Sequence, residues 1–230
     1  MKKLVVTGAS RGIGFELVQY LISQNCSVLA LSRNAIRLEA LKAHCNSPHL
    51  EIMPFDLANP DWKALDAIMP QMGQLDGLVN NAGLLINKPF LETMDNDWVT
   101  QFQVNVFGPA QLSRHLFPYL KKSDSAHIVN IGSMGGYQGS SKFPGLSAYS
   151  SSKAALATLT ECLAEEWKDE GIHVNCLALG AVGTEMLQEA FPGYEPPLGA
   201  KEMAAYIGDF VLHQQAFYNG KILPVSISTP

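Results

Sequence analysis

The chain has 230 residues, of which 47% are hydrophobic and 16% charged, and this composition excludes a disordered or coiled-coil protein. The length is that of one α/β domain, so we expect a single domain over residues 1–230. A net charge of -5 without a cluster of Lys or Arg argues against a nucleic-acid-binding surface.

The cysteines and the apolar runs predict where the protein works. Cys26, Cys45, Cys162 and Cys176 lie far apart with no C-x-x-C pair, which predicts reduced thiols and neither disulfides nor a metal site. An apolar strand begins at Leu4, which leaves no room for a signal peptide. No apolar run approaches the roughly 18 residues of a membrane span. The sequence therefore predicts a cytoplasmic protein with no metal and no membrane partner.

The first predicted strand, residues 4–6, leads into the glycine-rich turn TGASRGIG at 7–14 and then into a helix. This order is the context of a phosphate-binding loop, in which glycines let the backbone approach a pyrophosphate. A tight turn without a ligand is the alternative. The turn residues that we expect to contact a cofactor are Gly8, Ser10, Arg11, Gly12, Ile13 and Gly14.

The end of the second predicted strand, residues 27–31, indicates which dinucleotide is bound. Folds that use NAD usually place Asp or Glu here to hold the ribose 2′-hydroxyl. This chain has Ser32 and Arg33 instead, and Arg11 projects from the glycine turn. Two guanidinium groups without a carboxylate suit a 2′-phosphate, which predicts a preference for NADPH over NADH. The alternative is that either arginine, Arg11 above all, is a solvated surface residue.

The third predicted strand, residues 50–55, ends at Asp56 and Leu57, where Asp56 either contacts the cofactor or only forms a turn. Asn59 and Pro60 are expected to begin the next helix as its N-cap and first residue.

A fourth strand, residues 76–79, is followed by Asn80, Asn81, Ala82 and Gly83. Small residues just past a strand end permit the close approach of a flat cofactor, so this loop is predicted to form a second wall of the same crevice.

A helix is expected to start near Asp95 and to carry Asn105 among apolar neighbours. A hydrogen-bonded core asparagine would be the ordinary interpretation. However, Pro109 has no N–H to give to the main-chain carbonyl of Asn105, and a free carbonyl at a kink can hold a water against Lys153.

A fifth strand, residues 126–131, delivers Ser133 to the sheet edge where ligands bind in open α/β folds. The glycine- and serine-rich loop 134–146 then returns the chain to a helix at 148–167. Tyr149 and Lys153 lie one turn apart on that helix, so they share a face. An adjacent ammonium lowers the pKa of a tyrosine from about 10 and suits it to proton transfer. A single Tyr-x-x-x-Lys is more often an ordinary surface pair.

The remaining elements complete an alternating pattern of strands and helices. A sixth strand at 172–177 is followed by a segment at 185–199, which is predicted to be a lid over an apolar pocket or a loop with its own apolar cluster. A helix at 201–217 and a last strand at 221–225 end the pattern. Alternation of this kind predicts a doubly wound parallel sheet with right-handed crossovers.

Taken together, these residues resemble the short-chain dehydrogenase/reductase family along nearly the whole chain. The resemblance is carried by residues 7–14, Asp56, Asn80 to Gly83, Asn105, Ser133, Tyr149, Lys153 and Thr184, in the family's order and near its spacing. It implies a Rossmann-type sheet of about seven strands in the order 3-2-1-4-5-6-7 that binds NAD(P).

The resemblance also implies residue roles. Tyr149 would be the acid/base, Ser133 would bind the substrate carbonyl, and Lys153 would bind the nicotinamide ribose and lower the pKa of Tyr149. Asn105 would complete a proton relay through its main-chain carbonyl and a water. Asn80 would brace the strands under the cofactor. Further expected cofactor contacts are Asp56, Leu57, Asn81, Ala82, Gly83, Gly180, Val182 and Thr184.

Three departures from the family pattern affect substrate shape or subunit contacts. Leu179-Gly180 stands where the family usually has Pro-Gly, the ending 223–230 lacks a Gly-Gly, and the loop before Tyr149 is longer than usual.

We therefore predict an NADPH-dependent enzyme that interconverts a carbonyl and an alcohol, acting on a small molecule as a homodimer or homotetramer. The alternative is a dinucleotide-binding sensor that has lost turnover. The identity of the carbonyl is not predicted, because thioesters, ketones, pteridines and sugars all remain open.

Overall fold

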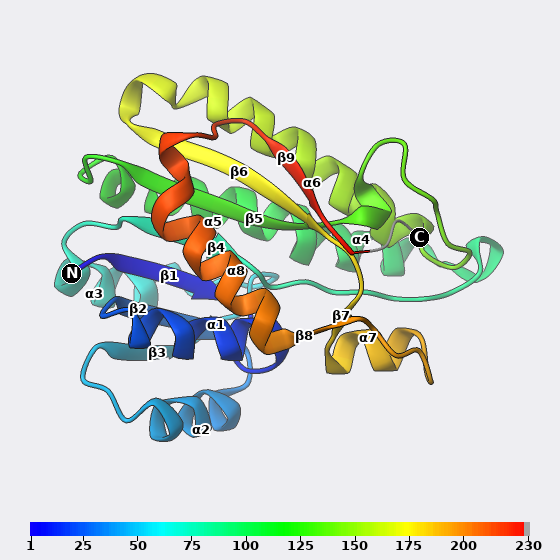
Figure 1. The fold of residues 1–230 in the computed structure, drawn as a ribbon, viewed down its shortest axis with the longest axis horizontal. Helices are drawn as coiled ribbons and strands as arrows, with labels where there is room; N and C mark the ends of the chain where they lie inside the picture. Colours follow the sequence, from blue (N-terminus) through cyan, green and yellow to red (C-terminus); the bar gives the residue numbers. More distant parts are fainter. Residues whose placement is uncertain (228–230) are drawn as a thin grey trace.

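The computed structural model describes residues 1–227, and its centre is a seven-stranded parallel sheet (Figure 1). The sheet strands are β1 (Lys3–Thr7), β2 (Ser27–Ser32), β3 (Leu50–Pro54), β4 (Gly77–Asn80), β5 (Ala126–Ser133), β6 (Ile172–Leu179) and β9 (Ile222–Val225). Their spatial order is β3-β2-β1-β4-β5-β6-β9. The predicted Rossmann order is confirmed, with β9 as the seventh strand of this sheet.

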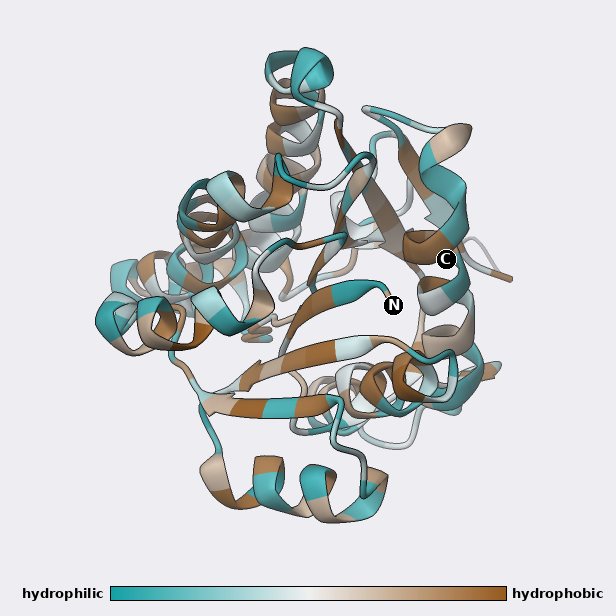
Figure 2. Cartoon of the chain, turned by 90° about the vertical axis from the view of Figure 1, so that its left-hand side faces the viewer, coloured by the Kyte–Doolittle hydropathy of each residue, from teal (hydrophilic) through white to brown (hydrophobic). Residues whose placement is uncertain are grey.

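Helices cover both faces of the sheet. The main helices are α1 (Gly12–Ser23), α2 (Ala35–Cys45), α3 (Trp62–Met72), α4 (Asp95–Phe102), α5 (Gly108–Leu120), α6 (Ser147–Glu166) and α8 (Ala200–His213). One apolar core lies between the sheet and α1, α2 and α8, and the other between the sheet and α3, α5 and α6. Figure 2 shows the predominantly apolar strands between these layers. Both faces of the strands are apolar because both are covered, as expected for parallel sheets.

Helix α3 begins two residues later than predicted. The Asp61 carboxylate accepts a hydrogen bond from the backbone N–H of Ala64 at 3.0 Å, so Asp61 is the N-cap, and the prediction of Asn59 and Pro60 for this start is wrong. Both Asn and Asp are good N-caps, and the one whose side chain reaches the free N–H groups of the first turn decides the start.

The helix that carries Asn105 is interrupted at the predicted place. Between α4 and α5 the chain forms a π-helical stretch, η2 (Gln103–Phe107), in which the backbone N–H of Gly108 donates to the carbonyl of Gln103. Pro109 lies in the first turn of α5. Because proline cannot donate to the carbonyl four residues earlier, a wider turn is accommodated here. This stretch leaves Asn105 fully buried.

Two strands of the sheet run further than predicted. β5 and β6 pair as far as Ser133 and Leu179, which are register partners. Leu179 also pairs with Val225 of β9. A proline at position 179 would lack the N–H that a ladder position offers, so the departure from the family pattern coincides with a longer strand. The next residue, Gly180, is needed because a Cβ atom there would lie 2.4 Å from the Ser226 hydroxyl.

The 185–199 segment contains a short helix that the sequence analysis did not predict, α7 (Glu185–Ala190). The segment is bracketed by a two-stranded parallel ribbon formed by β7 (Val182–Gly183) and β8 (Leu198–Gly199). Figure 1 shows α7 beside the carboxyl ends of the strands, at the opposite end of β1 from the N-terminus.

The remaining short elements are the 3-10 turns η1 (Phe90–Glu92), η3 (Met134–Gly136), η4 (Lys168–Glu170) and η5 (Gln214–Ala216). No helix within residues 1–227 is long and apolar enough to cross a membrane. The family departure at the C-terminus falls partly on residues 228–230, which lie outside the described residues.

Candidate active site

A cavity of about 570 Å³ opens at the carboxyl ends of the strands, between the glycine turn and the 185–199 segment. All of the predicted site residues except Gly14 and Asn105 line it. Those residues are Gly8, Ser10, Arg11, Gly12, Ile13, Ser32, Arg33, Asp56, Leu57, Asn81, Ala82, Gly83, Ser133, Tyr149, Lys153, Gly180, Val182 and Thr184.

The loop after β4 is hydrogen-bonded to the glycine turn. The Asn81 side-chain amide donates to the carbonyls of Thr7 and Gly8 at 3.0 and 3.3 Å, and the backbone N–H of Ala82 donates to the Thr7 hydroxyl at 3.0 Å. Gly8 has a φ of +69°, and a Cβ atom there would lie 2.8 Å from Cα of Ala82. Gly14 is behind the wall, where a Cβ atom would lie 2.3 Å from the Gly8 carbonyl oxygen. The turn therefore needs glycine for close approach and for its left-handed backbone.

The end of β2 faces the glycine turn through a hydrogen bond. The Ser32 hydroxyl donates to the Ser10 hydroxyl at 2.8 Å. Arg33 lines the cavity and is exposed, and no ion pair involves it among residues 1–227. A cation on this wall is available to an anionic ligand.

Arg11 differs from Arg33, because its guanidinium contacts two carboxylates of α7. Its Nη1 lies 2.9 Å from Glu185 Oε2 and 3.0 Å from Glu189 Oε1. Arg37 of α2 reaches the same Glu185 oxygen at 3.0 Å. The hydrogen bond with Glu185 raises the pKa of Arg11, and the two arginines lower the pKa of Glu185. The guanidinium predicted to bind a phosphate therefore also anchors α7 to the glycine turn.

Asp56 makes the turn that was the alternative to a binding role. Its Oδ1 accepts a hydrogen bond from the backbone N–H of Ala58 at 3.0 Å. The same residue lines the cavity, so the turn places a carboxylate beside the expected adenine position. Both interpretations are compatible with the geometry.

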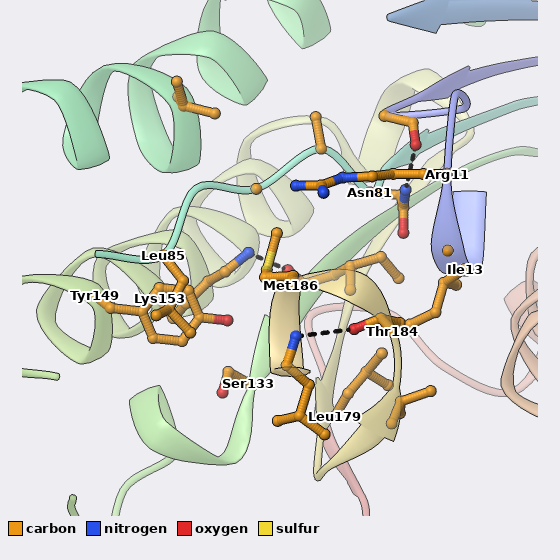
Figure 3. A pocket seen from close by; sticks show the side chains of 18 of the residues that line it. Arg11, Ile13, Asn81, Leu85, Ser133, Tyr149, Lys153, Leu179, Thr184 and Met186 are labelled. Carbon is orange, nitrogen blue, oxygen red and sulfur yellow. Dashed lines mark hydrogen bonds between the residues drawn. The ribbon is translucent and has the colours of Figure 1, made fainter. Parts of the chain in front are cut away.

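Tyr149 and Ser133 share the wall opposite the glycine turn (Figure 3). Burial raises the pKa of Tyr149, and the interaction with the Ser133 side chain opposes that rise. The Ser133 hydroxyl in turn accepts from the backbone N–H of Gly135 at 3.1 Å, which fixes its direction. The prediction that the pKa of Tyr149 is lowered is wrong for this structure, because desolvation of the phenolate outweighs the favourable contacts.

Lys153 is almost fully buried, with 4% of its surface exposed, and its Nζ donates to the Ile131 carbonyl at 2.7 Å. Burial lowers its pKa from 10.5 to about 8. The Lys153 Nζ lies over the Tyr149 ring, 5.9 Å from the ring centre, at the outer limit of a cation–π contact. The two side chains point into the same region, as the shared helical face predicts.

Asn105 lies behind this pair. Its side chain donates to the Leu84 carbonyl and to the Ser152 hydroxyl, each at 2.9 Å, and accepts from the Leu84 backbone N–H at 2.8 Å. A Cβ atom on Gly83 would lie 3.7 Å from Asn105 Oδ1 and 3.5 Å from Lys153 Nζ. The side chain therefore holds the loop after β4 against α6, and the role of the main-chain carbonyl stays a prediction.

Asn80 connects strands under the cavity. Its side-chain amide donates to Asn130 Oδ1 at 2.8 Å and to the Ser113 hydroxyl at 3.3 Å. Asn130 donates onward to the Thr160 hydroxyl of α6 at 2.9 Å. This buried chain of hydrogen bonds joins β4, β5, α5 and α6, as the family resemblance implied for Asn80.

The sequence analysis missed several apolar residues of the wall. Leu85, Val104, Met134, Leu146 and Leu179 all line the cavity. They stand in loops, at strand ends or in the irregular η2 turn, where no periodic pattern marks a buried face. Val104, Met134 and Leu179 directly precede or follow a predicted site residue, which could have indicated them, whereas Leu85 and Leu146 have no such neighbour.

The sequence matches the short chain dehydrogenase family model over residues 2–195. L-xylulose reductase from Bos taurus is 34% identical over 203 residues, covering 88% of this chain and 79% of the bovine protein. Two solved structures are similar over almost the whole fold. The first is the Pseudomonas aeruginosa RhlG/NADP active-site complex, with a TM-score of 0.87 and 26% identity over 98% of this chain and 94% of that one.

The second structure is 4-hydroxyisoleucine dehydrogenase complexed with NADH. It has a TM-score of 0.86 and 25% identity over 98% of this chain and 97% of that one. One of these two neighbours carries NADP and the other NADH, and their sheets correspond to the one described above. The chain therefore belongs to the short-chain dehydrogenase/reductase family and is an NAD(P)-dependent oxidoreductase.

Proposed function

We propose that this protein is an NADPH-dependent reductase that converts a carbonyl to an alcohol, with Tyr149 as the proton donor. The observation that carries the proposal is the convergence of Ser133, Tyr149 and Lys153 on one wall of the cavity, opposite the glycine turn. A protein that only binds a dinucleotide does not need Ser133, Tyr149 and Lys153 together, which argues against the alternative of a sensor without turnover.

The residues of the cavity fit a nicotinamide dinucleotide. The glycine turn offers backbone N–H groups at the start of α1, where the helix dipole favours a pyrophosphate. Ser32 and Arg33 would face the adenosine ribose, and Asp56 the adenine. Gly180, Val182 and Thr184 would face the nicotinamide. When bound, the cofactor supplies the hydride.

The chain's own residues would then handle the carbonyl oxygen. The Ser133 hydroxyl would hydrogen-bond to it and orient it, while the Tyr149 phenol would donate its proton to the same oxygen. A raised pKa keeps Tyr149 in the neutral form that a donor needs. The Lys153 ammonium would stabilise the phenolate left behind, since an opposite charge within about 6 Å favours the ionised form. The Asn105 carbonyl and a water would return a proton toward Lys153.

The preference for NADPH rests on Arg33 more than on Arg11. Among residues 1–227 no carboxylate pairs with the Arg33 guanidinium at the ribose end, whereas the Arg11 guanidinium is shared with Glu185 and Glu189. A hydrogen bond to a charged group contributes roughly 1.5–3 kcal/mol, so one such bond implies about a tenfold preference or more.

The test is the ratio of kcat/KM for NADPH to that for NADH, measured with one reducible substrate. We expect a ratio of about 10 or more in the wild type, and a value near one in Arg33→Ala through a higher KM for NADPH. Lys42→Ala is the matched control, because Lys42 carries the same charge on nearby α2 and pairs with Glu51 away from the cavity. A wild-type ratio near one would contradict the assignment of Arg33.

We also propose that the protein works in the cytoplasm as a homodimer or homotetramer, and that the 185–199 segment acts as its lid. The faces of α4 and η2 expose Val99 and Phe107, at 61% and 47%, which supports pairing through these helices. Light scattering measures the molar mass in solution, which distinguishes a monomer, a homodimer and a homotetramer.

A further inference from the structure

We propose that the substrate is an uncharged ketone or aldehyde whose alkyl or aryl group fills an apolar end of the cavity. The inference rests on the proposed carbonyl reductase activity and names its substrate class. We define the apolar end by its lining residues Leu85, Met134, Phe143, Leu146, Leu179, Met186 and Phe191.

These side chains surround the proposed position of the carbonyl. Met134 follows Ser133 directly, and Leu179 is the register partner of Ser133 across β5 and β6. Leu146 precedes α6 by one residue and lies one turn before Tyr149. Figure 3 shows Leu85 beside Tyr149. An apolar substituent on the carbonyl carbon would therefore meet carbon and sulfur atoms on every side.

The charges of the cavity lie elsewhere. Arg11, Arg33, Asp56 and Glu185 line the part that the dinucleotide would take, and Lys153 is bound to the Ile131 carbonyl. Within the described part of the chain, Lys153 beside Tyr149 is therefore the one cation at this wall, and the proposed reaction assigns it to the Tyr149 phenolate. A substrate carboxylate or phosphate placed there would lose its hydration without a partner, which is strongly unfavourable.

Polar uncharged substrates are disfavoured by the same wall. Apart from Ser133, Tyr149 and Lys153, which are assigned to the carbonyl oxygen and its proton, the polar side chain near this end among the described cavity-lining residues is the partly exposed Tyr194. A sugar presents several hydroxyl groups, and each one buried without a hydrogen bond costs binding free energy. The substrate group is therefore hydrocarbon-like.

Separate segments contact one another beside the apolar end, where 42% of the Phe143 surface is exposed. The rings of Phe143 and Phe191 meet edge to face with centroids 6.3 Å apart, joining the loop before α6 to the 185–199 segment. The Asn87 side chain donates to the Ala190 carbonyl at 2.9 Å, which ties the loop after β4 to the end of α7. These contacts shelter an apolar group from water, so its burial favours binding.

The first experiment compares straight-chain 2-ketones of increasing length with 2-oxo acids of the same carbon number, at saturating NADPH. We expect kcat/KM to rise about fourfold for each added methylene until the apolar end is full. Each 2-oxo acid should be reduced at least about 100-fold less efficiently than its matched ketone. An oxo acid or a keto sugar reduced within about tenfold of the best ketone would overturn the inference while leaving the carbonyl reductase activity intact.

A different outcome distinguishes failure of the proposed carbonyl reductase activity from failure of the substrate class alone. If none of the carbonyl compounds tested supports NADPH oxidation, whether it is apolar, anionic or sugar-like, the proposed function itself fails and this inference fails with it.

The second experiment places a charge in the apolar end. Met186→Arg on α7 should lower kcat/KM for the longest ketone at least tenfold and raise it for the matched 2-oxo acid, with the KM for NADPH unchanged. Gln188→Arg is the control, since it adds the same charge to the same helix but does not line the cavity. Equal effects of the two variants, or no change in the ratio of ketone to oxo acid, would show that Met186 does not face the substrate.

Discussion

Tyr149 sits between two opposing influences at the scale of single atoms. Burial disfavours its phenolate, and the Ser133 side chain favours it. In the proposed reaction the neutral phenol donates the proton, and the raised pKa keeps it neutral but makes it a weaker acid than a group whose pKa lies near the working pH. The proposed role of the Lys153 ammonium is to offset this by stabilising the phenolate that proton donation leaves.

Replacing Tyr149 by Phe removes the hydroxyl and nothing else of the wall. We expect kcat to fall 10²- to 10⁴-fold, the usual contribution of a general acid, while the KM for NADPH changes by less than about twofold. Tyr206→Phe on α8 is the control, because Tyr206 does not line the cavity. Retention of more than about a tenth of the wild-type kcat would show that another group donates the proton.

At the scale of elements, α7 is held to the body of the protein by charge. Glu185 lies at its first residue and contacts Arg11 of the glycine turn and Arg37 of α2, while Glu189 adds a second contact to Arg11. All four side chains are partly exposed. Exposed ion pairs contribute little each, so this anchor holds α7 only weakly in place.

The anchor predicts a small, local effect of Glu185→Gln. Amide hydrogens of residues 185–199 should exchange about two- to thirtyfold faster, because each exposed pair contributes about 0.2–1 kcal/mol and two are lost. Exchange in β1 and β4 should not change. Glu165→Gln, which breaks the exposed pair with Lys168 at the end of α6, controls for the loss of charge. Hydrogen exchange detected by mass spectrometry is the measurement, and unchanged exchange in the segment would rule out an electrostatic anchor.

At the scale of the whole molecule, a buried histidine joins elements that are distant in sequence. His127 of β5 donates from Nδ1 to the Val211 carbonyl of α8 at 3.2 Å, and its Nε2 accepts from the Asn175 side chain of β6 at 3.0 Å. Asn175 also accepts from the Lys221 backbone N–H at 3.0 Å, next to β9. These bonds need a neutral imidazole, and burial lowers the pKa of His127 from 6.5 to about 4.

The lowered pKa makes the folded state sensitive to acid. In the unfolded chain His127 binds a proton near pH 6.5, whereas in the folded protein it does so only near pH 4, so its stabilising contribution is present above about pH 6.5 and is lost as the pH falls toward 4. Between pH 7.5 and 5 the loss should be about 2 kcal/mol.

Urea unfolding at these two pH values measures the loss. In His127→Gln the difference between the two free energies of unfolding should shrink by about that amount. His49→Gln, at an exposed histidine, should leave the difference unchanged. An identical pH dependence in wild type and His127→Gln would show that another group is responsible for the acid sensitivity.

Much of this arrangement could be predicted from the sequence, and the reasons are local. Strands such as 4–6 are continuous apolar runs and the glycine turn identifies its own context, which predicted the parallel sheet, whereas the order of its strands came from the resemblance to the family. Helix α7 could not be predicted from the sequence, because six residues are too few to show a helical period and its N-cap, Thr184, had been assigned to the cofactor. The direction of the Tyr149 pKa depends on burial, which helical spacing does not reveal.

The β7–β8 ribbon has a consequence for how this chain can be altered. Val182 pairs with Leu198 and Gly183 with Gly199, so the stretch between them leaves and re-enters the body of the protein at neighbouring points. A stretch closed in this way is a cassette, because its length and composition can change without moving the ends of β6 or the start of α8. Stretches of other lengths and sequences could therefore be placed between positions 184 and 197 while the end of β6 and the start of α8 stay where they are.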